Sequence, residues 1–288
     1  MLKALGVEIH AGDITQRETI PAAMTGVDGV FHVAGWYKVG VRGPQADQVN
    51  VDGTRNVLKT MRTLGIPRGV YTSTVAVFSD TRGAVPDETY RFDGPHLSDY
   101  DRTKWIAHYR VALPKIDEGL PLTIVMPGVV YGPGDRSGIG TALVDLLRGR
   151  LPMTPSRTAF CWSHVEDTAR AHIVAMEKGS AGETYIITGP RHTFQEAFDM
   201  AARIAKVRAP LVHFGPYTMR ALAFLMKRVG RVANLPPALQ SESLRVLAGT
   251  TYFGSNEKAI RDLGLTSRPL DEGLAQTIEY ELRLLGRV

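Results

Sequence analysis

A tyrosine and a lysine four residues apart are the side chains of this sequence with the clearest chemical use. They begin and end the run Tyr100-Asp-Arg-Thr-Lys104, which follows Ser98. Residues four apart share one face of a helix, so the Lys104 ammonium can lie near the Tyr100 phenol. A free tyrosine has a pKa near ~10, and a nearby cation favours the phenolate. The spacing therefore predicts that Tyr100 acts as an acid or base near neutral pH.

Hydroxyl side chains precede this motif in the run Tyr71-Thr-Ser-Thr-Val-Ala-Val-Phe78. The run reads as a buried strand, and Ser73 or Thr74 could hydrogen-bond a substrate oxygen that Tyr100 must also reach. The structural alternatives are an exposed Tyr–Lys pair on a surface helix and an ordinary strand threonine. The order of the two motifs along the chain favours the catalytic interpretation.

Strand and helix signals alternate along the part of the chain that carries these motifs. Short β-branched runs, each followed by Gly, Pro or polar residues and then a helical pattern, cover residues 7–9, 29–33, 69–77, 122–130 and 183–188. Alternation of this kind predicts an α/β fold with a parallel sheet. Strand signals thin out after residue 189. We therefore expect a sheet domain over 1–189 and a smaller, mostly helical substrate lobe over 190–288, to which 132–162 could contribute.

Several helix ends are marked by capping residues. Thr15 with Glu18 and Thr193 with Glu196 have capping-box spacing, Ser98 can cap the helix that carries Tyr100, and Gly65 and Gly264 stand where helices end.

Composition describes an ordinary globular protein. The chain has 288 residues, is 44% hydrophobic and 22% charged, and has a mean hydropathy of −0.08, which excludes disorder, collagen and coiled coil. Its single cysteine, Cys161, cannot form an internal disulfide, and no Cys/His cluster has zinc-ligand spacing. We therefore expect a cytoplasmic protein without a metal site. The first residues resemble neither a signal peptide nor a membrane span, and no other apolar run is long enough to cross a bilayer.

The net charge is +5, but basic and acidic residues are interspersed, so we do not expect a nucleic-acid partner. The densest basic stretch comprises Arg220, Lys227, Arg228 and Arg231, in a segment where Met219, Leu222, Ala223, Met226, Val229 and Val232 recur at helical spacing. Such a segment could lie on a membrane surface or bind acidic groups. We favour an amphipathic helix that covers a substrate cleft.

Seven segments in succession resemble the extended short-chain dehydrogenase/reductases, the NAD-dependent epimerase/dehydratase group. They are Gly12-Asp-Ile14, His32-Val-Ala-Gly35, Asn50-Val-Asp-Gly-Thr-Arg-Asn-Val57, Thr72-Ser-Thr-Val-Ala-Val77, Tyr100-Asp-Arg-Thr-Lys104, Pro127-Gly-Val-Val-Tyr-Gly-Pro-Gly-Asp135 and Val165-Glu-Asp-Thr-Ala-Arg-Ala-His172. Seven segments in the right order are far more specific than any one of them. The resemblance implies a Rossmann-like, doubly wound parallel sheet and binding of NAD or NADP.

The resemblance also implies roles for individual residues. Tyr100 would be the acid or base, Lys104 would bind the nicotinamide ribose and lower the Tyr100 pKa, Thr74 would polarise the substrate oxygen, and Asn50 would hold a proton-relay water. The implied cofactor-binding residues are Asp13, Ile14, Val33, Ala34, Gly35, Thr72, Tyr100, Lys104, Pro127, Gly128 and Val130, with Asp13 at the adenine and 127–130 beside the nicotinamide. Candidate substrate contacts are Trp36, Tyr37, Thr74 and Arg136. Taken singly, Asp13 could instead be a turn residue and Asn50 an ordinary helix residue.

One family motif is missing. The family opens with a strand and a GxxGxxG turn that receives the pyrophosphate, and this sequence contains no such motif. The chain begins where the family's third strand would, so we expect an N-terminally incomplete sheet in which strand 7–9 has no neighbour and strand 29–33 is an exposed apolar edge. Either Met1 is an internal methionine of a complete enzyme, which we favour, or the product is a non-catalytic or partner-dependent member of the group. The preference between NAD and NADP cannot be read.

The run 127–132 and the Met/Phe-rich segment 214–235 look most like the dihydroflavonol-reductase-like branch, which has apolar carbonyl or alcohol substrates. Nucleotide-sugar epimerases and dehydratases are the alternative. Dehydratases usually carry Asp-Glu after the Thr74 position, where this chain has Val75-Ala76. Many members form homodimers through the Tyr-Lys helix. Trp105, Ile106 and Tyr109 could serve that face or pack against the chain's own core.

Overall fold

A parallel four-stranded sheet forms the centre of the molecule in the computed structural model, which describes residues 5–37, 43–230 and 239–287. Its strands are β1 (Val30–His32), β2 (Gly69–Thr72), β3 (Leu122–Pro127) and β7 (Thr184–Ile187), in the order β1-β2-β3-β7. The buried strand β3 is apolar on both faces because helices cover both. The predicted α/β, Rossmann-like parallel sheet is confirmed.

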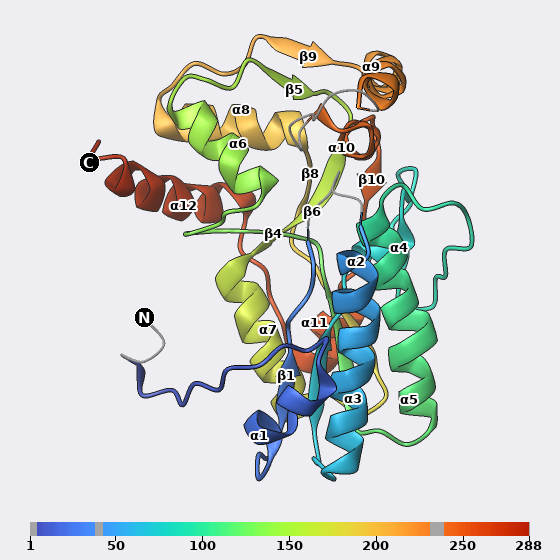
Figure 1. The fold of residues 1–288 in the computed structure, drawn as a ribbon. Coiled ribbons are helices and arrows are strands. Elements are labelled where there is room, and N and C mark those ends of the chain that lie inside the picture. The colour runs from blue at the N-terminus through green and yellow to red at the C-terminus, as the bar shows by residue number, and fades with distance from the viewer. Residues whose placement is uncertain (1–4, 38–42, 231–238, 288) are drawn as a thin grey trace.

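Helices pack on both faces of this sheet (Figure 1). One face carries α3 (Thr54–Thr63) and a long helix made of α4 (Asp99–Ile106), the π-helical segment η5 (Ala107–Ala112) and α5 (Leu113–Asp117). The other face carries α7 (Val165–Lys178) and α11 (Glu257–Leu263). Alternate residues of each strand serve the two faces: Tyr71 packs in the first core, whereas Val70 and Val125 pack in the second.

The second part of the molecule is built around β6. Strand β6 (Ala159–His164) pairs in parallel with β4 (Val129–Tyr131) and β10 (Thr251–Tyr252), and antiparallel with β8 (Arg191–Thr193). A separate pair joins β5 (Met153–Pro155) to β9 (Val212–Phe214). The helices of this lobe are α6 (Gly138–Leu147), α8 (Phe194–Ala205), α9 (Pro216–Val229), α10 (Ser241–Val246) and α12 (Leu270–Leu284). The short helices α1 (Pro21–Met24), α2 (Gln45–Asp47) and η3 (Gln48–Gly53) precede α3 in the chain, and β1 lies between α1 and α2.

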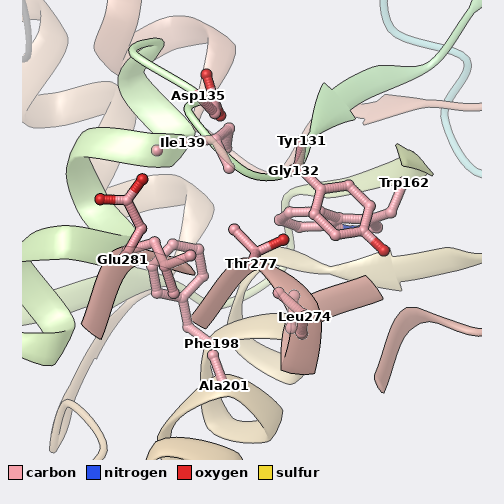
Figure 2. Close-up of a pocket in the computed structure, with 13 residues that line it drawn as sticks. Tyr131, Gly132, Asp135, Ile139, Trp162, Phe198, Ala201, Leu274, Thr277 and Glu281 are labelled. Carbon is pink, nitrogen blue, oxygen red and sulfur yellow. The ribbon is translucent and has the colours of Figure 1, made fainter. Parts of the chain in front are cut away.

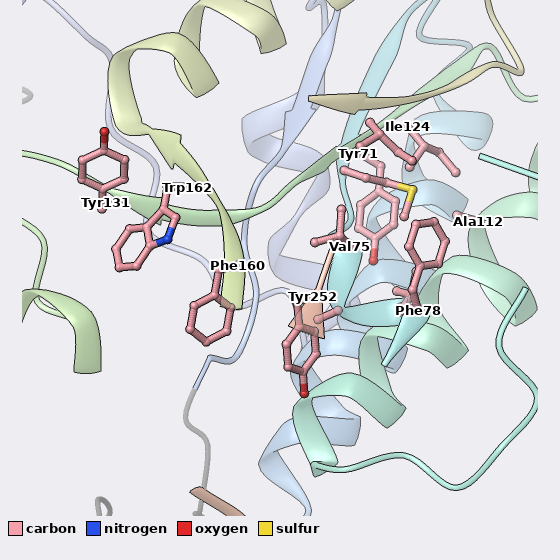
Figure 3. Close-up of a cluster of buried hydrophobic side chains, with 14 of the residues drawn as sticks. Tyr71, Val75, Phe78, Ala112, Ile124, Tyr131, Phe160, Trp162 and Tyr252 are labelled. Carbon is pink, nitrogen blue, oxygen red and sulfur yellow. The ribbon is translucent and has the colours of Figure 1, made fainter. Parts of the chain in front are cut away.

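The two parts share one continuous core. Figure 3 shows Tyr71, Val75 and Phe78 beside the sheet, with Tyr252 and Phe160 between them and Trp162 of the lobe. The rings of Phe160 and Tyr252 stack with centroids 5.9 Å apart. The sheet and the lobe therefore meet through buried aromatic rings.

Two predicted strands are shorter in the structure. Strand β2 ends at Thr72, and residues 75–78 form a 3-10 turn, η4 (Val75–Phe78), instead of continuing the strand. The expected strand 122–130 is divided at Gly128 into β3 and β4, which lie in different sheets. A Cβ atom on Gly128 would lie 2.2 Å from the carbonyl oxygen of Cys161, so the chain crosses from one sheet to the other where two backbones approach closely.

The N-terminal expectations are partly wrong. Residues 7–9 form no strand and are exposed, because no described strand offers them a hydrogen-bonding partner. Thr15 and Glu18 form no capping box: the Thr15 amide donates to Asp13 Oδ1, and the short 3-10 turn η2 (Arg17–Thr19) follows Gln16. The exposed apolar edge is confirmed, since β1 pairs only with β2 among the described strands and Phe31 is 46% exposed.

The other capping predictions are confirmed. Thr193 and Glu196 form a reciprocal capping box at the start of α8. The Ser98 hydroxyl accepts a hydrogen bond from the Asp101 amide and caps α4. Gly65 and Gly264 follow the ends of α3 and α11 with φ of 64° and 66°, the left-handed conformation that favours glycine.

Candidate active site

A cavity of about 430 Å³ lies at the carboxyl ends of β1, β2 and β3, where ligands of open α/β sheets bind. Residues that follow these strands form one wall, and the N-terminal half of α4 forms another. The start of α7 and elements of the lobe complete the cavity; the lobe contributes β4, the loop after it, β6, α10 and β10. Its lining residues are Val33, Gly35, Tyr37, Thr72, Ser73, Thr74, Val75, Ala76, Tyr100, Asp101, Lys104, Pro127–Asp135, Ser137, Phe160, Val165, Val246 and Tyr252.

Tyr100 faces this cavity from the first turn of α4. Its ring meets the Tyr37 ring edge-on, with centroids 4.8 Å apart. Loss of water around the phenol raises the pKa of Tyr100 above its usual range, while a hydrogen bond with Thr74 acts in the opposite direction. Tyr100 is therefore a neutral phenol at neutral pH, which can donate a proton.

Lys104 is buried against strand β2. Its Nζ donates to the Thr72 carbonyl at 2.7 Å and to the Tyr71 hydroxyl at 3.2 Å, and it lies 4.7 Å from the centre of the Tyr71 ring. Burial lowers the pKa of Lys104 to about 7. The expected lowering of the Tyr100 pKa by Lys104 is not seen, because the Lys104 ammonium hydrogen-bonds to β2 and the loss of water around the phenol has the larger effect.

Thr74 and Ser73 occupy the bend between β2 and η4. The Thr74 hydroxyl accepts from the Ala76 amide at 3.1 Å, which caps the 3-10 turn and holds this side chain in the cavity wall. The Ser73 hydroxyl lies 2.8 Å from His108 Nδ1. Burial, assisted by the Lys104 charge, lowers the pKa of His108 to about 3, so this imidazole is neutral. His108 was not predicted from the sequence, although it stands four residues after Lys104 on the same helix.

Asn50 does not line the cavity; it ties neighbouring segments together. Its Oδ1 accepts from the Trp36 amide at 2.7 Å, and its Nδ2 donates to the Trp36 carbonyl at 3.1 Å and to the Thr103 hydroxyl at 2.9 Å. Both N–H groups of the amide are thus used. Asn50 stands in the π-helical segment η3, a local geometry that often occurs at functional sites. Its role with a relay water stays a prediction.

Six of the predicted cofactor-binding residues besides Tyr100 and Lys104 line the cavity: Val33, Gly35, Thr72, Pro127, Gly128 and Val130. The side chain of Thr72 is positioned by His172, whose Nε2 lies 2.7 Å from the Thr72 hydroxyl. Asp13, Ile14 and Ala34 are not among the lining residues. Asp13 accepts from the Thr15 amide at 2.8 Å as a turn residue does, and Ile14 packs beside Gly53.

Only some of the candidate substrate residues line the cavity. Tyr37 lines the cavity, whereas the Trp36 backbone is held by Asn50. Arg136 is outside the lining, although its neighbours Asp135 and Ser137 belong to it. Its side chain is 68% exposed and approaches Glu281 to 3.8 Å.

Glu281 belongs to a second, much smaller cavity behind the Asp135 loop. Figure 2 shows its walls, with Tyr131 and Trp162 on one side and Phe198, Leu274 and Glu281 around it. Its volume of about 10 Å³ is close to the minimum for one water molecule. This cavity is too small for a substrate.

Asp101 and Tyr252 form a buried polar pair in the wall of the large cavity, and sequence reasoning missed both. Asp101 is 3% exposed; its Oδ1 accepts from the Ser98 hydroxyl at 2.7 Å and its Oδ2 from the Tyr252 hydroxyl at 3.0 Å. Burial, with a smaller contribution from Glu242, raises the pKa of Asp101 to about 7. The Ser98-to-Asp101 spacing is a capping-box signal, but nothing local identifies Tyr252, which lies 151 residues away.

The nicotinamide end of a dinucleotide fits this cavity. A buried lysine offers a hydrogen-bond donor, and small residues after β1 and β3, together with Tyr100 and Thr74, line the same cavity. Two buried histidines contact neighbouring residues: His32 Nε2 lies 2.9 Å from the Thr54 hydroxyl, and His164 caps α7. In the described part of the chain no group of three or more His, Cys, Asp or Glu could hold a metal ion.

Comparison with known proteins gives a consistent result. The model of the NAD dependent epimerase/dehydratase family matches residues 2–188. Sterol demethylase protein B of Methylococcus capsulatus is 29% identical over 287 residues, which cover 97% of this chain and 86% of that protein. A putative dihydroflavonol 4-reductase of Synechocystis is 27% identical, covering 95% and 80%. The crystal structure of gox2253 superposes with a TM-score of 0.83 at 29% identity, covering 100% of this chain and 88% of that one.

Proposed function

The chain belongs to the NAD-dependent epimerase/dehydratase family, and from this premise we propose that it is an NAD(P)-dependent oxidoreductase acting on the carbonyl or alcohol group of a small apolar substrate. One observation carries the proposal: Thr74, which follows β2, and Tyr100 and Lys104, which both stand on α4, meet in a cavity whose other walls are mainly apolar. The names of two relatives, a sterol demethylase protein and a putative dihydroflavonol reductase, refer to apolar ring systems and support it.

Each side chain has a defined task in this proposal. The bound nicotinamide supplies or accepts the hydride. The Thr74 hydroxyl donates a hydrogen bond to the substrate oxygen, and the neutral Tyr100 phenol gives that oxygen its proton in the direction of reduction. Lys104, together with Val33, Gly35 and residues 127–130, holds the nicotinamide half of the cofactor.

The charge of the cavity wall favours an uncharged substrate over a nucleotide sugar. Lys104 is the only basic side chain among the described lining residues, and Asp101 and Asp135 are acidic. Arg136, the nearest candidate for binding a diphosphate, is directed toward Glu281. Among the described lining residues, a nucleoside diphosphate would meet two carboxyl groups and no arginine, whereas Phe160, Val246 and Val165 suit an apolar ring.

The test compares the wild-type protein with Tyr100→Phe. We expect oxidation of NADH or NADPH with a steroid ketone or a flavanone and none with a UDP-sugar, and a loss of turnover of about 10²–10⁴-fold in Tyr100→Phe. The variant should retain cofactor binding, because it lacks only a hydroxyl. Turnover of UDP-sugars alone would favour the epimerase alternative. An inactive wild-type protein would favour the non-catalytic or partner-dependent alternative, and an active Tyr100→Phe variant would exclude Tyr100 as the proton donor.

Two further expectations belong to this proposal. A cytoplasmic location remains a prediction from the single cysteine. The homodimer also remains a prediction. Trp105 and Tyr109 already have partners in their own chain: the Trp105 indole N–H donates to the Phe92 carbonyl at 2.9 Å and the Tyr109 hydroxyl to the Tyr90 carbonyl at 2.9 Å.

A further inference from the structure

The lobe carries apolar side chains that point to solvent at one end of the molecule. Helix α9 and strand β9 lie at the top of Figure 1, at the opposite end from α1, α3 and α5. The exposed large apolar residues here are Leu211 (91% exposed), Val212 (46%), Tyr217 (83%), Phe224 (62%) and Leu225 (54%). Together they form what we call the α9 patch.

Helix α9 is apolar on two sides, although only one side is packed. Its inner side contacts α10 through a small core of Met219, Ala223, Leu244 and Ala248. None of its residues lines the large cavity, so the prediction that this helix covers a substrate cleft is wrong for α9. The outer side presents Tyr217 and Phe224, seven residues or two helical turns apart. Large apolar side chains gathered on an exposed surface are typical of a site that contacts a membrane or another molecule.

The sequence segment that contains this patch carries charge of one sign. Residues 200–230 contain six of the chain's 34 Lys and Arg (Arg203, Lys206, Arg208, Arg220, Lys227 and Arg228) and none of its 29 Asp and Glu. The rest of the chain therefore has 28 basic and 29 acidic residues, so this segment carries all of the net positive charge. All six basic side chains are exposed. Arg231 and Val232, which the sequence pattern also included, lie outside the described residues.

We propose that the α9 patch docks the protein on the surface of an anionic lipid membrane. Exposed Phe, Leu and Tyr side chains beside Lys and Arg on one helix are the combination by which peripheral helices enter the headgroup region. The Arg228 guanidinium lies 4.5 Å from the centre of the Phe224 ring, so the cationic and apolar groups are adjacent. No described helix is long and apolar enough to cross a membrane, which makes this a surface contact.

A second copy of the chain fits this surface less well. A two-fold symmetric dimer through α9 would place Arg220, Lys227 and Arg228 of one helix against the same residues of the other, and α9 has no acidic residue to pair with them. An anionic bilayer offers both the negative charge and the apolar layer. The proposal does not rest on the proposed reaction, because it uses none of the cavity residues.

The test is flotation of the purified protein with vesicles of phosphatidylcholine, with and without phosphatidylglycerol. We expect binding only to the anionic vesicles and weakening by salt. Each Lys or Arg near such a surface strengthens binding about fivefold, so Lys227→Gln with Arg228→Gln should weaken binding about 25-fold. Phe224→Ser with Leu225→Ser should weaken it by at least about tenfold. Ile260→Ser, at a residue of α11 that is 49% exposed, is the matched control and should bind like the wild type.

Three results would overturn the proposal: no binding to anionic vesicles, binding that neither double variant weakens, or a dimer in solution that Phe224→Ser with Leu225→Ser dissociates while vesicles are not bound. The last result would identify the patch as a protein interface. Since the changed side chains are exposed, all variants should unfold in urea close to the wild type, and this verifies that they fold.

Discussion

Replacing Asp101 by asparagine should make the protein less sensitive to pH between about pH 4 and 7. The carboxyl group is almost fully buried and its pKa in the folded protein is about 7, because desolvation opposes ionisation more strongly than the Ser98 and Tyr252 hydrogen bonds favour it. In the unfolded chain an aspartate has a pKa of about 3.9. The native state therefore holds a proton over a range of pH in which the unfolded state has released it.

This difference fixes the sign of the effect. When the native state binds more protons, the free energy of unfolding falls as the pH rises. The fall amounts to about 1.4 kcal/mol per pH unit, or about 4 kcal/mol over the whole interval between the two pKa values. Above pH 7 both states are ionised and the loss is complete. The Asp101→Asn variant carries no ionisable group there and escapes this loss.

Urea unfolding of the wild type and of Asp101→Asn at pH 5 and pH 8 measures this pH-dependent loss of the free energy of unfolding. Taking the difference between wild type and variant at each pH cancels the contribution of the other titrating groups. We expect the variant to gain about 3 kcal/mol relative to the wild type from the lower to the higher pH. Tyr252→Phe removes a hydrogen bond that favours the ionised carboxyl group and should shift the wild-type loss to higher pH. A difference between wild type and Asp101→Asn that is the same at both pH values would refute the reasoning.

Two other perturbations follow from the site. Burial lowers the Lys104 pKa to about 7, so between pH 7 and about pH 10 the unfolded state binds one more proton than the native state, and the free energy of unfolding rises by about 1.4 kcal/mol per pH unit. Lys104→Met should abolish this rise. Urea unfolding at the two ends of that range measures it, and an unchanged rise in the variant would contradict the prediction. Gly128→Ala should lower the free energy of unfolding by about 1–3 kcal/mol or more, since its Cβ would lie 2.2 Å from the Cys161 carbonyl oxygen. Gly138→Ala is the control, because the added Cβ there meets nothing within 4 Å. Thermal unfolding compares the two variants, and equal melting temperatures would argue against the prediction.

The elements that sequence reasoning predicted well are those specified by local signals. Strands β1 and β7 fall within the predicted runs 29–33 and 183–188. The caps at Ser98 and Thr193 formed because the partner amide is only three residues away. Neither prediction depended on a distant part of the chain.

The predictions failed where contacts between segments far apart in the sequence determine the local structure. The strand predicted at 122–130 is interrupted at Gly128 by the backbone of Cys161, a contact no local pattern contains. The apolar run at 7–9 has strand composition but no described strand to pair with. The same holds in the site. Tyr100 and Lys104 were predicted from their spacing and Thr74 from the hydroxyl run before them, whereas the cavity wall at Tyr252 depends on a contact between residues 151 positions apart.

The residues inside the Tyr100–Lys104 motif do more than set its spacing. Asp101 reaches Tyr252 in the lobe, Thr103 receives the Asn50 amide from η3, and Lys104 binds the Thr72 carbonyl of β2. Three positions of one helical segment thus hold three different parts of the molecule. Because the Tyr100 phenol stands on that same segment, its place between the strand ends and the lobe is determined by all three contacts together. A change at Asp101 that spares the phenol should therefore still misplace it relative to the substrate side of the cavity, where a 1 Å displacement can reduce turnover about 100-fold.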